Sequence, residues 1–363
     1  MKKTNILLLF LTLPLFAQNN SITTIIDEQI VEKTPFYGLA SYYNNVNYFI
    51  LDEALTAVEA NVQTTLNNKQ KLVAVGRFKV LVVKADKLVF SLSEQGQITI
   101  ENPSSQQLTS SQLQVYSKPE LAKISPQYDL IRYSHLWAPL AWLAKAMEAS
   151  LVFVHKNLVS NWGWAIIVFG VLLKLLLIPA GLLTTKFQRR VSQVKTALEP
   201  KLAAIKSKYD GEQAHHKIMA AHKELGVSPF YTLKPLLGSF IQIPILIAVF
   251  NALGEMPQLQ GQSFLWIKDL AYPDSLAVFD FGLPMFGHSL NLLPFIMTIV
   301  TIFSTIIFKN KFATTRELKG QKTNLYLMAF AFFVLFYPFP AAMVLYWVLA
   351  NILQTIQQQI IKI

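Results

Sequence analysis

Long apolar runs separated by short charged segments fill the second half of the chain. Each run lacks the strict polar–apolar alternation of a half-buried strand, and most are close to the length of about 20 residues that a helix needs to cross a bilayer. The sequence therefore predicts an α-helical polytopic membrane protein with a five-span core between residues 161 and 363. The predicted spans are residues 162–183, 235–253, 290–308, 325–337 and 341–358.

The last two spans come from one apolar run, residues 325–350, which contains Pro338 and Pro340. Each proline removes a helical N–H donor and clashes with the preceding turn, so the pair favours a tight hairpin of two helices. A single tilted span is the alternative. As one helix the run would measure about 39 Å, against a hydrocarbon core of roughly 30 Å.

The first residues have the pattern of a targeting segment. Lys2 and Lys3 precede an apolar stretch of 11 residues, which is short for a span. Residues 1–17 are therefore predicted to be a secretory signal peptide, and an uncleaved N-terminal anchor is the alternative. Both interpretations export the residues that follow.

Residues 18–130 are predicted to form a small exported (periplasmic) domain that is mostly β. Runs rich in Val, Leu, Phe and Ile lie between turn residues, which is typical of strands. The predicted strands lie within 71–83, 87–93 and 97–101, a helix is predicted at 52–66, and the Ser- and Gln-rich residues 102–114 are predicted to form a loop.

Residues 131–160 are aromatic and amphipathic. Trp137 and Trp142 occur there together with Lys145, Glu148 and Lys156. Tryptophans mixed with charges favour a helix that lies in the membrane interface, and a second span is the alternative.

The charges of the connecting segments predict the orientation. Residues 184–234 carry ten Lys and Arg against four Asp and Glu, and residues 309–323 carry five against one. Residues 255–289 carry one against four. Because positively charged loops stay in the cytoplasm, the first two segments are predicted to be cytoplasmic and the third external. The C-terminus is then cytoplasmic.

The basic segment 184–234 also has helical periodicity on both sides of Asp210-Gly211. This pattern predicts an antiparallel helical hairpin with a basic surface in the cytoplasm. Its recurring apolar residues are Val191, Val194, Leu198, Leu202, Ile205, Ile218, Ala221 and Leu225.

Composition agrees with a membrane protein: 53% of the 363 residues are hydrophobic and only 15% are charged, with a formal net charge of +11. Intrinsic disorder is excluded, since such chains are poor in apolar residues. The chain has no cysteine, which excludes disulfides, Fe–S clusters and cysteine-based zinc sites.

Lys174 is the clearest candidate functional residue. It is the thirteenth residue of the predicted span 162–183, and none of the predicted spans contains an acidic residue to pair with it. A cation at this depth costs about 2.5–3.5 kcal/mol on insertion scales, so such residues usually face a water-filled cavity. A lysine that extends to the interface is the alternative, but its stem reaches only about one helical turn.

Other polar residues are predicted to line the same cavity. Gln242 lies inside the second span, and Asn351, Gln354 and Gln358 share one face of the last helix. Tyr346 and Trp347 precede them by about one turn. Interhelical hydrogen bonding would explain each residue singly. Together with Lys174 they predict a polar groove that is open towards the cytoplasm.

Catalytic and metal sites are not expected, and no cofactor is predicted. His215, His216 and His222 lack a carboxylate or cysteine to complete a metal site, and no phosphate-binding or nucleophile motif occurs. The protein is therefore not predicted to be an enzyme. A transporter or channel that uses Lys174 as an anion site is the alternative function, although the sequence lacks the internal repeat and the intramembrane carboxylates of many transporters.

From about Trp137 to the C-terminus the chain resembles the YidC-type membrane protein insertases, which are related to the Oxa and Alb insertases of organelles. Its motifs are weak singly, and their order and spacing make the resemblance specific. They are Asn161-Trp162-Gly163 with a cation twelve residues after the Trp, Leu198-Glu199-Pro200-Lys201, Gln242-Ile243-Pro244-Ile245, Phe264 to Leu270, Tyr337-Pro338, Val344-Leu345-Tyr346-Trp347, Asn351 and Gln357-Gln358-Gln359.

The resemblance implies a five-span core around a hydrophilic groove that is open to the cytoplasm and to lipid. A groove cation, which corresponds to Lys174, would receive the polar segment of a nascent membrane protein. The implied partners are nascent membrane proteins, the Sec translocon, the ribosome and the lipid bilayer of the bacterial inner membrane. Two departures stand out: the family's groove cation is usually Arg, and the exported domain is smaller than in typical Gram-negative members.

Overall fold

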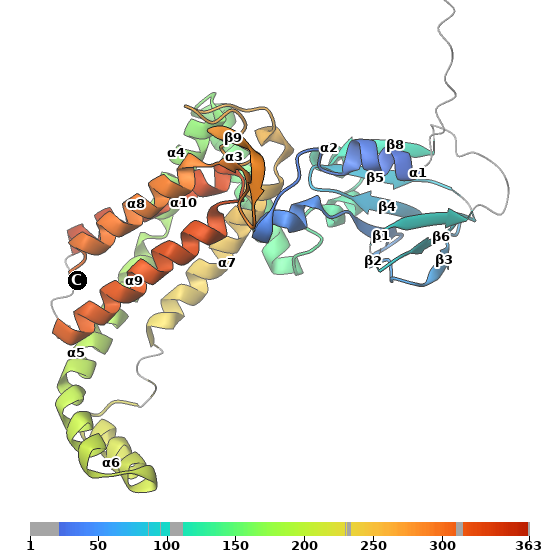
Figure 1. Cartoon of the computed structure of the whole chain (residues 1–363). Coiled ribbons are helices and arrows are strands. Elements are labelled where there is room, and N and C mark those ends of the chain that lie inside the picture. Colours follow the sequence, from blue (N-terminus) through green and yellow to red (C-terminus); the bar gives the residue numbers. More distant parts are fainter. Residues whose placement is uncertain are drawn as a thin grey trace, which may run out of the picture. The chain divides into compact units, whose positions relative to one another are not determined.

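The computed structural model describes residues 22–85, 87–94, 96–101, 112–228, 230, 234–309 and 315–361, so the predicted signal peptide lies outside the described residues. The chain divides into two compact units. The first takes in residues up to Val31 together with Val46–Tyr116, and the second takes in Glu32–Asn45 and everything from Ser117 onwards. Figure 1 labels the elements of both.

The division between the units differs from the predicted domain boundary at residue 130. The segment Glu32–Asn45, which contains the 3-10 helix η2 (Gly38–Asn44), belongs to the second unit. Tyr272 donates a hydrogen bond of 2.8 Å to the Glu32 carboxylate, and the Tyr43 hydroxyl lies 3.4 Å from the Met343 sulfur. These contacts join residues about 240 and 300 positions apart, which sequence periodicity does not reveal.

The first unit is rich in β-structure, as predicted. A five-stranded sheet has the order β2-β1-β4-β5-β8, and a three-stranded sheet has the order β3-β6-β7. The short helices α1 (Ile22–Ile25) and η1 (Ile26–Ile30) precede the strands. The strands are β1 (Asn47–Leu51), β2 (Leu55–Ala57), β3 (Gln63–Thr65), β4 (Lys71–Val75), β5 (Lys79–Val83), β6 (Val89–Leu92), β7 (Ile98–Glu101) and β8 (Leu113–Ser117).

The core of the first unit forms around β4 and β5. These strands pair antiparallel, with Leu72 opposite Val83, and four consecutive residues of each are buried. Ile22, Ile26 and Ile30 pack against the same cluster. Because both faces of these strands are buried, their sequence is a continuous apolar run without polar–apolar alternation.

The helix predicted at residues 52–66 is wrong. The structure places β2 and β3 there, and β2 pairs with β1 while β3 pairs with β6. Thr56, Thr64 and Thr65 are β-branched, which favours strands. Hydrogen bonding to the neighbouring strands outweighs the weak helical pattern of this segment. Most of the predicted loop 102–114 lies outside the described residues, and β8 begins within its last part.

The second unit is helical, as predicted. It contains a small two-stranded sheet of β9 (Ala277–Leu283) and β10 (Gly287–Leu290) and the short elements α2 (Lys118–Ile124), η3 (Pro126–Ile131) and η5 (Pro257–Leu259). Its longer helices are α3 (Ala138–Asn157), α4 (Trp162–Leu176), α5 (Ile178–Lys208), α6 (Gly211–Glu224), α7 (Lys234–Glu255), α8 (Leu292–Ile307), α9 (Thr315–Phe336) and α10 (Ala341–Ile361).

Local chemistry explains where α4 begins and how closely it packs. The Asn161 side chain accepts hydrogen bonds from the backbone N–H groups of Gly163 and Trp164 at 2.9 and 3.3 Å, which is the usual action of an N-cap. A Cβ at Gly163 would overlap the ring of Phe264. The residue after the Trp in this motif must therefore be glycine for the loop containing Phe264 to close over the helix end.

The predicted span 162–183 is not one continuous helix in the structure. α4 ends at Leu176 and α5 begins at Ile178, with Pro179 in its first turn, where a missing N–H is tolerated. Among the described residues, no helix taken alone is both long and apolar enough to cross a bilayer. The pair α3 and α4 meets that requirement only together, bent by 119° at its break. The predicted number of spans therefore stays a prediction.

The helices α5 and α6 form an antiparallel hairpin around a small apolar core. Leu198 and Ala221 are buried at its centre, and Val191, Val194 and Leu202 pack around them. These residues belong to the periodic positions that predicted the hairpin. Its location relative to a membrane stays a prediction.

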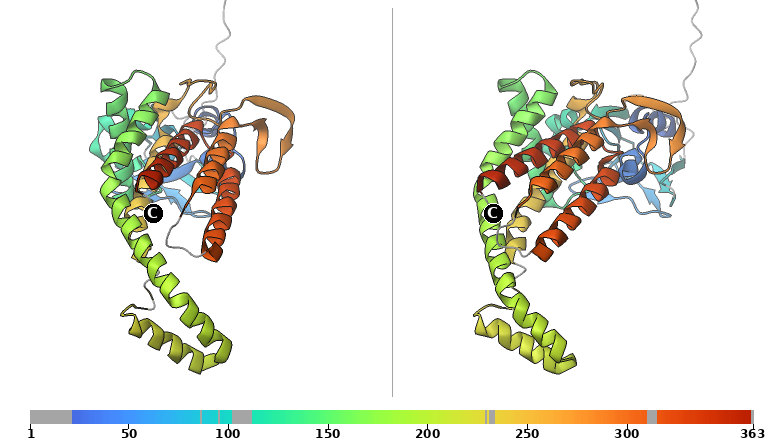
Figure 2. Two further views of the ribbon diagram at one scale, coloured as in Figure 1. Left: turned by 90° about the vertical axis from the view of Figure 1, so that its left-hand side faces the viewer. Right: turned by 60° about the vertical axis from the view of Figure 1, so that its left-hand side comes forward.

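The ends of α8, α9 and α10 are fixed by side chains and loops. Asp274 accepts hydrogen bonds of 2.9 Å from the backbone N–H groups of Leu292 and Leu293, which satisfies the first turn of α8. The backbone N–H of Ala341 donates to the Tyr272 carbonyl at 2.8 Å at the start of α10. α8 packs against both α9 and α10, and α10 also packs against α4 (Figure 2).

Candidate functional site

Six of the seven residues predicted to line the groove line one cavity, and the seventh, Gln358, lines a second cavity described below. Its volume is about 470 Å³, and its walls come from α4, α7, α9 and α10. We call it the Lys174 cavity. The six residues are Lys174, Gln242, Tyr346, Trp347, Asn351 and Gln354.

Lys174 carries the only charge among the described residues that line this cavity. It is half-buried, and its Nζ donates a hydrogen bond of 2.6 Å to Gln354 Oε1 on α10. None of the described residues that line the cavity has a carboxylate, and the partner of Lys174 there is a neutral amide. An ammonium group of this kind can bind an incoming carboxylate, since charge-assisted hydrogen bonds are stronger than neutral ones.

Aromatic side chains hold Trp347 in place at the cavity wall. The ring centroids of Phe250, Phe332 and Phe336 lie 5.5, 5.1 and 5.1 Å from that of the indole. The indole Nε1 is buried and has no hydrogen-bond partner in the described part of the chain. An unsatisfied buried donor costs about 1–3 kcal/mol, so this N–H would gain free energy from a hydrogen bond to an acceptor.

Close packing between α4 and α10 sets the floor of the cavity. A Cβ at Gly170 would lie 2.6 Å from a methyl carbon of Leu349, so a larger residue there would push the helices apart. Glycine at this position therefore keeps Lys174, one turn later on α4, within reach of Gln354.

A second cavity of about 510 Å³ adjoins the first and shares Met328, Asn351 and Gln354 with it. We call it the hydroxyl–amide cavity. Its walls come from α5, α8, α9 and α10. The polar residues that line it are Ser192, Thr301, Ser304, Thr305, Gln321, Asn324, Asn351, Gln354, Thr355 and Gln358.

The sequence prediction missed the α8 side of this second cavity. Thr298, Thr301, Ser304 and Thr305 recur at helical spacing in an otherwise apolar run. That spacing was the available signal. Hydroxyl groups in apolar helices commonly donate to backbone carbonyls of their own helix. The spacing of these hydroxyls therefore does not indicate a cavity unless the position of α10 is known.

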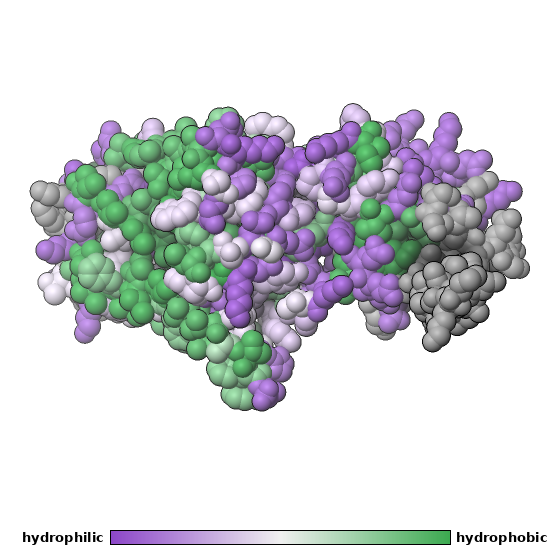
Figure 3. Space-filling view, turned by 90° about the horizontal axis from the view of Figure 1, so that it is seen from above, coloured by the Kyte–Doolittle hydropathy of each residue, from purple (hydrophilic) through white to green (hydrophobic). Residues whose placement is uncertain are grey.

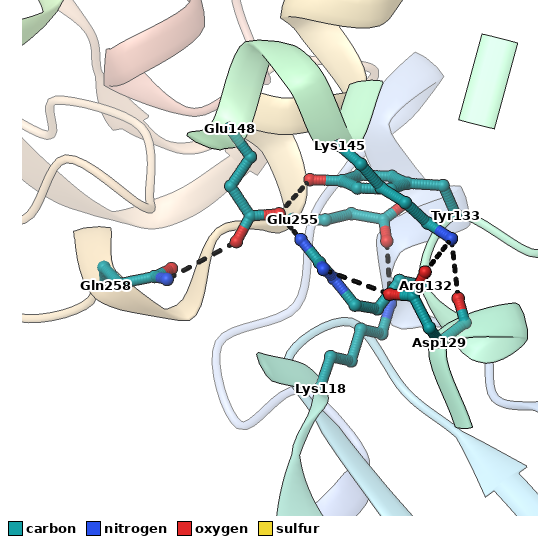
Figure 4. Close-up of polar contacts among 8 residues, drawn as sticks. All are labelled: Lys118, Asp129, Arg132, Tyr133, Lys145, Glu148, Glu255 and Gln258. Atoms are coloured by element: carbon teal, nitrogen blue, oxygen red, sulfur yellow. Dashed lines mark hydrogen bonds and ion pairs between the residues drawn. The ribbon is translucent and has the colours of Figure 1, made fainter. Parts of the chain in front are cut away.

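The structure also reveals an ionic cluster outside both cavities, which the sequence did not predict (Figure 4). It joins α2, η3, α3, α7 and η5. Its members are Lys118, Asp129, Arg132, Tyr133, Lys145, Glu148, Glu255 and Gln258.

Two buried carboxylates organise this cluster. Lys118 Nζ lies 2.7 Å from Glu255 Oε2, and both side chains are 9% exposed. Glu148 accepts hydrogen bonds of 2.7 Å from the Arg132 guanidinium and from the Tyr133 hydroxyl. Burial, followed by the charge of Glu148, raises the pKa of Tyr133 well above its usual value. The cluster therefore links α3 to the end of α7.

Asp129 and Lys145 form the more exposed edge of the cluster. Lys145 Nζ lies 2.7 Å from Asp129 Oδ2, and the Asp129 side chain is 41% exposed. Burial opposes ionisation of this carboxyl, but the hydrogen bond and charge of Lys145 and the nearby Arg132 outweigh it and lower the pKa of Asp129.

Among the described residues, no group of three His, Asp or Glu side chains is arranged to hold a metal ion. His215 and His216 lie on α6, and their ring centroids are 6.4 Å apart.

The family model described as 60Kd inner membrane protein matches residues 153–363, which include every residue that lines the two cavities. The chain belongs to this family. It is 32% identical over 228 residues to a protein of Chlorobaculum parvum named membrane protein insertase YidC, covering 61% of this chain and 37% of that protein. It is 28% identical over 277 residues to the protein of the same name from Chlorobium luteolum, covering 72% and 44%.

This member of the 60Kd inner membrane protein family thus matches less than half of the length of these curated relatives. A solved structure titled as an active YidC insertase with its first transmembrane domain resolved is 18% identical. The similarity covers 86% of this chain and 82% of that one with a TM-score of 0.40, which does not define the fold of this chain.

Proposed function

We propose that this protein is a membrane protein insertase and chaperone of the bacterial inner membrane. It receives the polar segment of a nascent protein in the groove formed by the two cavities and lets the adjoining apolar helix pass into lipid. The observation that carries this proposal is the placement of Lys174, a cation with no counter-ion among the described residues, in a cavity between apolar helices. Membership of an inner membrane protein family and similarity to proteins named YidC support it.

The physical task of an insertase is to move hydrated peptide groups through an apolar layer. Each unsatisfied backbone group costs several kcal/mol in hydrocarbon. The two adjoining cavities offer hydrogen-bonding side chains along part of that path. A segment that crosses through them therefore has a lower barrier than one that crosses lipid, and no nucleotide hydrolysis is required.

Lys174 would select acidic segments. Its ammonium group is held by the Gln354 amide, a neutral partner that an incoming carboxylate would replace. The Trp347 side chain lines the same cavity, and its N–H, which has no partner in the described part of the chain, would donate to a carbonyl or carboxylate of the segment. Attraction between unlike charges is stronger at this depth than in water, because the effective dielectric is lower.

We further propose the topology that the sequence predicts. Residues 18–130 are exported as a periplasmic domain, five spans follow from residue 162, and the α5–α6 hairpin within 184–234 and the C-terminus lie in the cytoplasm. The charge distribution of the connecting segments supports this orientation. Apolar side chains gather on the surface of the helical unit (Figure 3), where they would face lipid, and examples on α8 and α9 are Ile299, Phe303, Leu327 and Phe330.

Two partners follow from this proposal besides the nascent chain and the bilayer, namely the ribosome and the Sec translocon. The basic α5–α6 hairpin offers a surface for ribosomal RNA or for anionic lipid at the cytoplasmic side. The Sec translocon would deliver larger substrates. The protein would act alone on small ones.

A reconstitution experiment tests the function. Liposomes that contain only the purified protein are given a small single-span protein with a short acidic tail, and protection of the tail from external protease is measured. Protection above that of empty liposomes is expected. Absence of protection, together with anion flux into the same liposomes, would instead establish a transporter or channel.

A further inference from the structure

The hairpin of β9 and β10 exposes a row of apolar side chains outside the two cavities. Every residue of β9 is exposed. The exposed fractions of Phe279, Phe281 and Leu283 are 37%, 61% and 50%. Figure 2 shows the hairpin, in orange, projecting beyond the helices next to it. Contiguous apolar side chains of this kind mark a surface that binds a protein or a membrane.

The two faces of β9 differ in polarity. Successive residues of a strand point to opposite faces, so Phe279, Phe281 and Leu283 share one face and Asp280 lies on the other. The rings agree with this placement, because the centroids of Phe279 and Phe281 are 5.4 Å apart and their planes differ by 19°. Asp280 is the only Asp, Glu, Lys or Arg between residues 277 and 290. An apolar face with a carboxylate behind it suits an element that lies in a membrane interface.

The hairpin leads directly into an apolar helix with an exposed face. β10 ends at Leu290, and α8 begins at Leu292. Exposed apolar side chains recur at helical spacing along one side of α8, at Phe295, Ile299, Phe303 and Ile306. Because the chain belongs to a family of inner membrane proteins, lipid is the partner that fits this side of α8.

The length of α8 explains why the apolar surface extends into the hairpin. Its 16 residues measure about 24 Å, against a hydrocarbon core of roughly 30 Å. At its C-terminal end the apolar run stops at Phe308, and Lys309 follows. At its N-terminal end the apolar side chains continue into β10 and β9. The hairpin therefore lies at the end where the apolar surface can be lengthened.

We propose that the β9–β10 hairpin is an interfacial anchor that binds the lipid bilayer. The face of Phe279, Phe281 and Leu283 lies at the boundary between headgroups and acyl chains, and Asp280 stays in water. The anchor holds the N-terminal end of α8 at that depth. This inference depends on the membrane location of the protein and not on insertase activity, so either can fail without the other.

Fluorescence quenching tests the depth of the hairpin. The chain has no native cysteine, so Phe281→Cys and Asp280→Cys can each carry one NBD fluorophore on opposite faces of the same strand. The full-length variants are reconstituted into vesicles of phosphatidylethanolamine and phosphatidylglycerol. The quenchers are aqueous iodide and lipids with a nitroxide either near the headgroup or near the end of the acyl chain. Asp280→Cys is the matched control, because it carries the same fluorophore one residue away.

The two labels are expected to respond in opposite ways. The nitroxide near the headgroup should quench the label at position 281 several-fold more than the label at position 280, and iodide should do the reverse. Leu283→Cys, on the same face as Phe281, should behave like Phe281→Cys. It gives the same test if Phe281→Cys does not fold, as judged by its thermal unfolding midpoint.

Three results would overturn the anchor. The first is equal quenching of both labels by iodide, which would place the hairpin in water. The second is stronger quenching of the label at position 281 by the nitroxide near the end of the acyl chain, which would place it in the hydrocarbon core. The third is a disulfide between two copies of Phe281→Cys under a mild oxidant without quenching by any nitroxide lipid, which would identify a second copy of the chain as the partner.

A second readout tests the effect on α8. In the double variant Phe279→Ser, Phe281→Ser, an NBD label at Phe295→Cys, in the first turn of α8, should become several-fold more accessible to iodide. A label at Ile306→Cys, in the last turn, should not change and is the control. Unchanged quenching of the label at position 295 in the folded double variant would contradict the anchoring of α8.

Discussion

Lys174 on α4 and Gln354 on α10 are 180 residues apart in the sequence and are joined by a hydrogen bond of 2.6 Å. The ammonium group of a lysine in the last turn of α4 is thereby held in a cavity by a neutral partner. A neutral partner stabilises the charge less than a carboxylate would. A carboxylate would therefore be a stronger acceptor for the Lys174 ammonium group than the Gln354 amide.

The Trp347 indole provides a prediction about the cavity wall. Trp347→Phe removes the unpartnered N–H and keeps an aromatic ring among Phe250, Phe332 and Phe336. Insertion of an acidic-tailed substrate should fall about twofold to tenfold, the effect of one hydrogen bond. The thermal unfolding midpoint should not fall in parallel, because the lost donor had no partner among the described residues. Trp164→Phe, which changes an exposed indole on α4, is the control, and an equal loss in both variants would contradict the assignment.

The buried Lys118–Glu255 pair predicts a stability effect that depends on which partner is removed. Glu255→Gln leaves the ammonium of Lys118 buried without a counter-ion and should destabilise the second unit by about 3–5 kcal/mol. The double variant Lys118→Met, Glu255→Leu should recover most of that loss, since apolar replacement of a buried pair is often neutral. Thermal unfolding of the single and double variants measures the difference. A loss of stability in the double variant equal to the sum of the losses in the two single variants would show that the two residues are not energetically coupled.

Asp129 predicts a pH dependence of stability. Its folded-state pKa is lowered, so it binds a proton less readily in the folded than in the unfolded chain. The stabilisation is then fully present above its unfolded value and is lost as the pH falls through the lowered folded-state pKa. The unfolding midpoint should drop on acidification below about pH 4, the unfolded value of an aspartate. Asp129→Asn should flatten that part of the profile, and an unchanged profile would exclude this carboxyl as its source.

Gly163 predicts a steric effect at the start of α4. Gly163→Ala places a methyl group against the ring of Phe264 and should cost about 1–3 kcal/mol through overpacking. Adding Phe264→Leu should recover part of the loss by making room. The unfolding midpoints of the three variants test this, and a single variant as stable as the wild type would show that the loop moves away freely.

The residues that line the Lys174 cavity could be selected from the sequence because they obey rules within single elements, while their role in binding stays a prediction. A lysine in an apolar run and polar residues at helical spacing on one helix are visible without any tertiary information. The ionic cluster could not be predicted, because its partners lie on different elements. Lys118 and Glu255 are 137 residues apart, and each alone looks like an ordinary surface charge.

The errors have equally specific causes. Residues 52–66 lack strong periodicity, so pairing of β2 with β1 and of β3 with β6 overrides their weak helical pattern. Thr301 and Ser304 were missed because hydroxyls in helices usually satisfy themselves, and only the approach of α10 places them in a cavity. The interruption at Leu177 lies where Pro179 permits a new helix start, which hydropathy alone does not separate from a continuous span.

The most direct test of the central claim is the rate at which proteoliposomes insert an acidic-tailed single-span protein when Lys174 is changed to Glu, with Lys174→Arg as the matched variant. The account predicts that Lys174→Glu slows insertion about tenfold or more, a loss of about 1.4 kcal/mol or more from the transition state. Lys174→Arg keeps the charge and should insert at close to the wild-type rate. Equal rates for the wild type and a folded Lys174→Glu variant would contradict the account.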